Sequence, residues 1–206
     1  MDGDIFNRLT SQIGKYGAKA PDSRHGNDQK YEISDALKAA FGVFFFQFPS
    51  VLQFMRAMQE EQKRNNISSL LKLERLPSDT QIKTLLDGID PKYLSPIFNN
   101  TLKIADEVGI INDYRVFGNH VLLALDGVWY HSSEKIHCKH CLHQTKDGIT
   151  TYYHSALAGA IVKPHSPYVL PVISEMITNS DGEKKQDCEL NAAKRCLENH
   201  GRVFAA

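Results

Sequence analysis

The stretch N-H-V-L-L-A-L-D-G-V-W-Y-H-S-S at residues 119–133 decides the fold class, because the chain changes there from helical to extended patterning. It is a short apolar run, interrupted by Asp126-Gly127 and resumed by an aromatic pair, which is typical of a strand. Two later segments are also short apolar runs: T-Y-Y-H-S-A-L-A-G-A-I-V-K-P at 151–164 and Y-V-L-P-V-I-S-E-M-I-T at 168–178. We therefore predict three strands, near residues 120–131, 151–162 and 168–174.

The segment Q-D-C-E-L-N-A-A-K-R-C-L-E-N at residues 186–199 predicts a helix after these strands. Leu190, Ala193 and Leu197 form its expected apolar stripe, and Gly201 stands where a glycine commonly ends a helix. The residues from Arg202 onward indicate the opening of a fourth strand.

Residues 34–110, which precede the strands, are predicted to be all-helical, because apolar residues recur there at helical spacing. Ser78 and Gln81 have the spacing of a capping box at the start of one of these helices. Residues 1–33 are rich in glycine and polar side chains, and we expect a flexible leader with at most a short helix at Ile5–Ile13. The other three expected helices run from Ser34 to Pro49, from Ser50 to Lys63 and from Pro96 to Val108.

The sequence therefore predicts an α+β chain in three regions, a leader at 1–33, a helical block at 34–110 and a sheet-containing region at 111–206. Its 206 residues carry 24 Lys+Arg and 24 Asp+Glu, and this balance excludes a strongly basic nucleic-acid-binding chain. The longest apolar run, Ala39–Phe48, is about half of the ~20 residues that a membrane helix needs. The N-terminus has no secretory pattern, so we expect a cytoplasmic protein without a membrane partner.

Asp126 is the first candidate site residue. A carboxylate at the edge of an apolar strand is unfavourable unless it is solvated, paired or bound to a metal, and Mg²⁺ sites use one or two such carboxylates. The alternative is that Asp126-Gly127 forms the turn of a hairpin.

The motif H-C-K-H-C at residues 137–141 is the second candidate site. Two cysteines separated by two residues can bind one Zn²⁺ ion, and His154, His165 or Cys188 can complete the ligand set. The predicted set is Cys138, Cys141 and His154. The alternative is a loop rich in Cys and His that binds no metal. The four cysteines of the chain fit reduced thiols or metal ligands better than a disulfide framework.

The acidic residues Asp187 and Glu189 precede or begin the helix at 186–199, where negative charge suits the helix dipole. Cys188 and Cys196 are expected to act as small core residues.

Six blocks of the chain, taken in order, resemble a family of bacterial insertion-sequence transposases of the DDE type. The resemblance spans about residues 34–204, and its most specific blocks lie at 123–141 and 185–197. The blocks are L-P-S-D-T-Q-I-K at 76–83, L-A-L-D-G-V-W-Y-H-S-S at 123–133, I-H-C-K-H-C at 136–141, T-Y-Y-H-S-A-L at 151–157, V-L-P-V-I-S-E-M-I at 169–177 and K-Q-D-C-E-L-N-A-A-K-R-C-L at 185–197.

The resemblance implies a ribonuclease-H-like core in which Asp126 is the first of three metal-binding carboxylates. It also implies Mg²⁺ or Mn²⁺ as cofactor, transposon-end DNA as partner, and association with further copies or with intact transposase. The second Asp and the Glu of the family have no counterpart in this chain. The acidic residues that come into question as substitutes lie before or at the start of the helix at 186–199, not where the resemblance places the other ligands; they are Asp181, Glu183, Asp187 and Glu189. Because two cations about 4 Å apart need more than one carboxylate, we expect the N-terminal part of a transposase, cut in its fourth strand and inactive alone.

Two other functions fit the sequence. In the first, the helical block binds transposon ends through a helix-turn-helix-like pair at Ser50–Lys63 and Ser78–Leu86. The zero net charge of the chain disfavours this DNA-binding function. In the second, the chain is a small zinc-binding protein built on Cys138 and Cys141.

Overall fold

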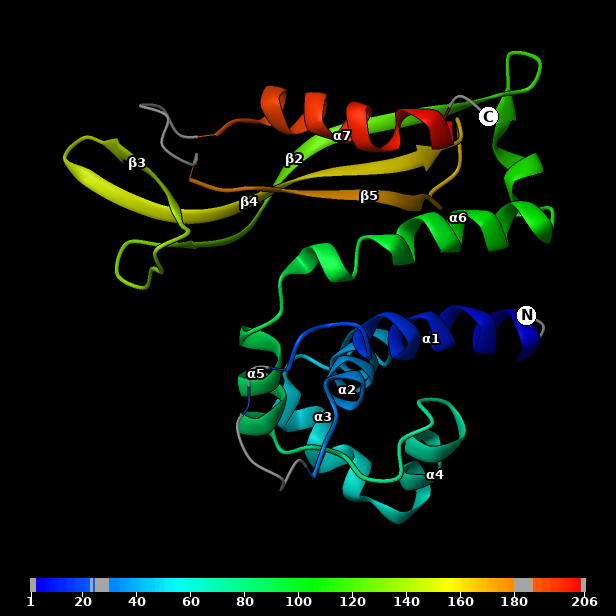
Figure 1. The fold of residues 1–206 in the computed structure, drawn as a ribbon, viewed down its shortest axis with the longest axis vertical. Coiled ribbons are helices and arrows are strands. Elements are labelled where there is room, and N and C mark those ends of the chain that lie inside the picture. The colour runs from blue at the N-terminus through cyan, green and yellow to red at the C-terminus, as the bar shows by residue number, and fades with distance from the viewer. Residues whose placement is uncertain (1–2, 23, 25–29, 180–186, 205–206) are drawn as a thin grey trace. The chain divides into compact units, whose positions relative to one another are not determined.

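The computed structural model describes residues 3–22, 24, 30–179 and 187–204 (Figure 1). These residues form seven α-helices, two 3₁₀ helices and five strands, so the predicted α+β class is confirmed. The chain divides into two compact units, Met1–Asn100 and Thr101–Ala206. Within the described ranges, no helix combines the length and the apolar character needed to cross a membrane.

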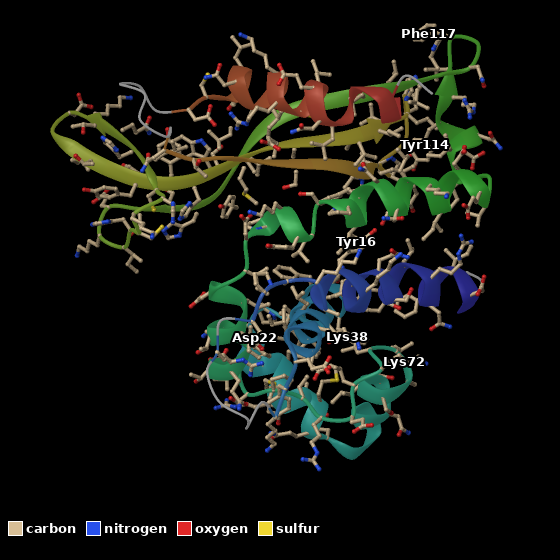
Figure 2. All side chains as sticks on the ribbon, viewed as in Figure 1. Tyr16, Asp22, Lys38, Lys72, Tyr114 and Phe117 are labelled. Carbon is tan, nitrogen blue, oxygen red and sulfur yellow. The ribbon has the colours of Figure 1, made fainter. Side chains whose placement is uncertain are left out.

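The first unit is helical. Residues expected in the leader form α1, which is longer than the predicted helix at Ile5–Ile13. Tyr16 of α1, labelled in Figure 2, shares a hydrogen bond of 2.6 Å with Asn100. The helices of this unit are α1 (Gly3–Gly17), α2 (Ile33–Phe45), α3 (Val51–Gln59), α4 (Glu61–Ser69), α5 (Asp79–Asp87), the short η1 (Pro91–Tyr93) and the first turn of α6 (Pro96–Glu107).

Polar side chains begin the helices largely as the sequence predicts. Ser78 and Gln81 form the expected capping box of α5, with hydrogen bonds of 2.9 and 3.3 Å. Helix α2 begins one residue before the expected start at Ser34, and Glu32 and Asp35 form its capping box.

The helix predicted at Ser50–Lys63 is two helices, because Glu60 has an extended backbone between α3 and α4. Helix α4 therefore separates the two helices that the sequence suggested as a helix-turn-helix-like pair, and they are not consecutive. Phe54 is fully buried in the core of this unit. A Cβ atom on Gly42 of α2 would lie 2.9 Å from its ring, so glycine allows the close approach of α2 and α3.

The second unit is built on an antiparallel sheet whose central strand is β4. Strand β2 pairs with one side of β4 along most of its length. The other side of β4 is shared, because β3 pairs with Ile149–Tyr153 and β5 pairs with Ser155–Ile161. The strands are β1 (Arg115–Val116), β2 (His120–Ser133), β3 (Leu142–Lys146), β4 (Ile149–Val162) and β5 (Leu170–Ile177), preceded by η2 (Ile110–Tyr114) and followed by α7 (Glu189–Phe204).

Helix α7 lies along the sheet (Figure 1) and buries Ala192 and Cys196 completely. Arg195 of α7 binds Glu175 of β5 at 2.9 Å and Asp187 at 2.7 Å, which joins the helix to the strand edge. The core around this contact consists of Ala105, Ile111, Tyr114, Leu142, Leu157, Ile161, Val172, Ile173, Ile177, Ala192 and Cys196.

Three expectations for the helix at 186–199 are corrected. Leu190 and Leu197 are 65% and 54% exposed, so the buried stripe is formed by Ala192 and Cys196 instead. The helix continues through Gly201 to Phe204. The expected end at Gly201 and the expected strand from Arg202 are therefore both wrong. Of the two cysteines expected in the core, Cys196 is buried, but Cys188 is exposed.

The hairpin alternative for Asp126-Gly127 is also wrong, because both residues lie inside β2. The sheet does contain an Asp-Gly turn, at Asp147-Gly148 between β3 and β4. Both residues have positive φ angles, 52° and 78°, as a tight two-residue hairpin requires. Strand β3 was not among the predicted strands.

Candidate metal centre

Cys138, Cys141 and His154 come together where β3 and β5 meet along β4. Tyr153 pairs with the first residue of β3, and Ser155 pairs with the last residue of β5. His154 lies between them, and Cys141 immediately precedes β3. The hairpin of β3 and β4 therefore brings the C-x-x-C motif to a histidine thirteen positions beyond Cys141.

The three donor atoms have the spacing of a tetrahedral metal site. The two sulfur atoms are 3.9 Å apart, and His154 Nε2 lies 3.4 Å from Cys138 Sγ and 3.3 Å from Cys141 Sγ. A tetrahedral Zn²⁺ ion with ordinary bond lengths requires about 3.8 Å between sulfurs and about 3.6 Å between sulfur and nitrogen. The three side chains thus form a group that could hold a metal ion.

The backbone of the Cys138–Cys141 turn supports the sulfur atoms. The amide of Cys141 donates to the Cys138 carbonyl at 3.2 Å, which closes the turn. The amide of His140 donates to Cys138 Sγ, and the amide of Cys138 donates to Cys141 Sγ, each at 3.3 Å. These hydrogen bonds fix the positions of both sulfur atoms within the turn. Cys141 is 4% exposed, whereas Cys138 is open to solvent.

His154 is held in the state that a metal ligand needs. Burial lowers its pKa, and the nearby His131 and His140 lower it further, so the neutral imidazole is favoured. Tyr130 stacks on the imidazole with 5.6 Å between ring centroids. Burial raises the pKa of Tyr130, and the adjacent Cys138 and Cys141 add to this effect, so the phenol stays neutral.

The described residues supply three ligands to this group. The sequence named His165 and Cys188 as further possibilities, and neither belongs to the group. Other histidines of the segment have different contacts. His131 Nε2 lies 3.3 Å from the Ile136 carbonyl oxygen, and His137 stacks on Tyr152 at 4.1 Å.

Asp126 lies apart from this centre. It is exposed in the middle of β2, opposite Ala158, and its Oδ1 accepts the Gly127 amide at 2.9 Å. In the part of the chain that the structure describes, Asp126 belongs to no group of three or more metal-binding side chains. The carboxylate of Glu189 packs against Gly127, where a Cβ atom would collide with it.

The other acidic candidates near α7 do not form a second metal centre in the described ranges. Burial opposes the ionisation of Asp187, but hydrogen bonds from Arg195 and the Cys188 amide outweigh it and lower its pKa. Asp181 and Glu183 lie outside the described residues.

The sequence analysis did not predict the aromatic stacks in this part of the sheet. Trp129 lies on Tyr153 with 4.0 Å between ring centroids and 15° between ring planes. Both residues lie on neighbouring strands, but the β-bulge after Trp129 shifts the register. The sequence shows the neighbouring aromatic residues at 129–130 and 152–153. Which ring stacks on which depends on the register of β2 and β4, and the sequence does not show that register.

Comparisons of the chain with protein-family models, curated proteins and solved structures found no match.

Proposed function

We propose that Cys138, Cys141 and His154 supply three of the four ligands of one Zn²⁺ ion. The observation that supports this is the set of three interatomic distances, each within about 0.3 Å of the tetrahedral values. Thiolate sulfur and imidazole nitrogen are ligands that suit Zn²⁺, whereas Mg²⁺ takes oxygen ligands. All four cysteines are free thiols, which fits a reducing compartment such as the cytoplasm.

The proposed ion would tie the loop before β3 to the middle of β4. Without it, the loop is held by contacts such as the stack of His137 on Tyr152 and the hydrogen bond of 3.2 Å from Asn179 Nδ2 to the Lys139 carbonyl. A bound ion would add a crosslink to the packing that Cys141 and Leu142, both buried, already provide at the start of β3.

Metal analysis of the purified chain tests the zinc proposal. We expect one Zn²⁺ per chain by mass spectrometry, and loss of the metal in Cys138→Ser and His154→Gln. Cys188→Ser is the matched control, because Cys188 is an exposed thiol outside the group and should keep the metal. Unchanged zinc content in both ligand variants would refute the proposed site.

For the chain as a whole, we propose a part of a DDE-type transposase, a metal-dependent enzyme that cuts and joins DNA strands. The observation that supports this is the antiparallel order β2, β4, β5 followed by α7, which is the order expected of a ribonuclease-H-like core. Strand β2 carries Asp126 and has a single partner strand from Leu122 to Ser133 among the described residues. A fourth strand of such a core would pair there.

In this proposal Asp126 is the first carboxylate that binds Mg²⁺ or Mn²⁺. Such ions activate the attacking hydroxyl and stabilise the leaving oxygen at phosphorus. Asp126 is exposed and has no described cation partner, so its charge is available to a metal ion. The second Asp and the Glu are not assigned to residues of this chain. Transposon-end DNA and further transposase copies are the proposed partners.

The coding sequence downstream of the Ala206 codon tests this second proposal. We expect it to encode, in some reading frame, an apolar strand that ends in an aspartate. The chain extended far enough to include both that aspartate and the missing glutamate should nick transposon-end DNA with Mg²⁺, and Asp126→Asn should abolish nicking. An extended chain that cuts equally well with Asp126→Asn would contradict the assignment.

A further inference from the structure

The two thiols of the candidate metal centre differ in their access to solvent. Cys138 is exposed, whereas Cys141 is 4% exposed and lies directly before β3. A dissolved reagent can therefore reach the first sulfur, while the second is shielded. Because thiol–disulfide exchange depends on access to the attacking sulfur, Cys138 is the thiol of this pair that reacts first.

The turn that joins the two cysteines suits a disulfide between them. The hydrogen bond of 3.2 Å from the Cys141 amide to the Cys138 carbonyl closes a turn of four residues. The end Cα atoms of such a turn lie within about 7 Å of each other, and disulfides join Cα atoms about 4.4–6.8 Å apart. The two sulfur atoms are 3.9 Å apart, so they must approach by about 2 Å to form a bond. Because Cys138 is exposed, its side chain has room to turn toward Cys141.

The other two cysteines of the chain lack this arrangement. Cys196 is completely buried under α7, and Cys188 is exposed just before that helix. Among the described residues, Cys138 and Cys141 are the one pair of cysteines whose sulfur atoms contact each other. An internal disulfide is therefore expected at this pair.

We propose that Cys138 and Cys141 form a reversible disulfide by reaction with a small disulfide such as oxidised glutathione. The Cys138 sulfur attacks one sulfur of the oxidant, and a mixed disulfide forms as the first thiol departs. The Cys141 sulfur then attacks Cys138 Sγ, and the second thiol departs as the internal disulfide closes. The two cysteines lose two electrons and two protons, which convert the oxidant into two thiols. In the zinc-bound chain the sulfurs carry no protons, so the departing thiolates take theirs from water.

The inference rests on the proposed zinc site and adds its regulation. Zn²⁺ binds cysteine as the thiolate, and a disulfide has no thiolate to offer. Of the three described ligands, oxidation leaves His154 alone, so the ion is released. The loop before β3 then loses its zinc crosslink to the middle of β4. A disulfide at an exposed position is readily reduced, so added thiols restore the metal site.

Treatment of the full chain, as purified, with oxidised glutathione tests the reaction. Trypsin cuts after Lys135, Lys139 and Lys146, so the disulfide should appear in mass spectrometry as the joined peptides 136–139 and 140–146. Brief treatment should place glutathione on Cys138 before Cys141. A zinc indicator should report the release of one Zn²⁺ for each internal disulfide formed, and a dithiol reductant should separate the two peptides again.

Two variants identify the thiol that closes the bond. Cys141→Ser should stop at the mixed disulfide on Cys138 and lose the joined peptides. Cys188→Ser is the matched control, because it removes an exposed thiol outside the centre and should form the joined peptides as the unmodified chain does. Loss of the joined peptides in Cys188→Ser would overturn the assignment of Cys141.

Glutathione that remains on Cys138 of the unmodified chain without closure would overturn the inference, and so would the absence of any reaction there. The disulfide and the zinc content are measured separately. A chain that contains zinc but never forms the joined peptides would retain the zinc proposal and reject the disulfide. A chain that forms the joined peptides but contains no zinc would retain the disulfide and reject both the zinc site and its regulation.

Discussion

The two halves of β4 belong to one strand but are stabilised differently. The half from Ser155 to Ile161 pairs with β5, and Leu157 and Ile161 are buried in the core with α7. The half from Ile149 to His154 pairs with β3, and Ile149 at its start is 55% exposed. Leu142 of β3 and Tyr153 still pack in this core, and we propose that the zinc ion adds to their packing in holding the outer end of β4.

The largest expected effect on the stability of the outer half of β4 comes from removing the proposed metal ion. Structural zinc contributes on the order of 10 kcal/mol to the folding of the elements it joins. We expect a chelator to abolish the hydrogen-exchange protection of β3 amides and to leave that of β5 amides unchanged. Protection of both strands that survives the removal of all bound zinc would show that the outer half of β4 does not need the metal.

An intermediate effect is expected from truncating one apolar side chain in each half. Leu157→Ala should lower the free energy of unfolding by about 2–5 kcal/mol, because Leu157 is 4% exposed. Ile149→Ala should change it by no more than about 0.5 kcal/mol. Urea unfolding measures both. Similar decreases in the free energy of unfolding for the two variants would show that both halves of β4 depend equally on apolar packing.

The smallest effect is expected from the ion pair between Asp187 and Arg195, which links the residues just before α7 to the helix. The pKa of Asp187 is lowered in the folded chain, so its stabilisation is present above the unfolded pKa of about 3.9 and is lost as pH falls through the folded value. We expect Asp187→Asn to lower stability at pH 7 by about 1 kcal/mol.

Thermal unfolding of Asp187→Asn and of the unmodified chain, measured from pH 7 down to pH 2, tests whether the stabilisation by Asp187 is lost as the pH falls. The difference between them should narrow as the pH falls. Glu198→Gln, at an exposed position of α7, is the control and should show no such trend. A difference that grows toward low pH would contradict the assignment.

Much of the fold could be predicted from local patterns. The three main strands and the capping box at Ser78 follow from periodicity and side-chain type. Strand β3 could not be predicted this way, because L-H-Q-T-K is mostly polar and becomes a strand by pairing with β4. The buried face of α7 was also missed, because the small residues Ala192 and Cys196 fit closely against the sheet and leave Leu190 in solvent.

The candidate metal centre shows the same limit. The C-x-x-C motif is visible in the sequence, and it identified Cys138 and Cys141 as the first two candidate ligands. The third depended on which of His154, His165 and Cys188 the sheet brings near, and that follows from the pairing of Leu142 with Tyr153. Register is a property of two strands together, so no single segment contains it.

Among the described residues, one edge of β2 has no partner strand from Leu122 to Ser133, and this has a consequence for self-association. An exposed strand edge is a template on which a second copy can add, and a charged side chain along that edge opposes aggregation. From Leu122 to Ser133, Asp126 is the single Asp, Glu, Lys or Arg. The carboxylate proposed for metal binding is thus also the gatekeeper of this edge, and Asp126→Asn should both abolish catalysis by an extended chain and increase its tendency to aggregate.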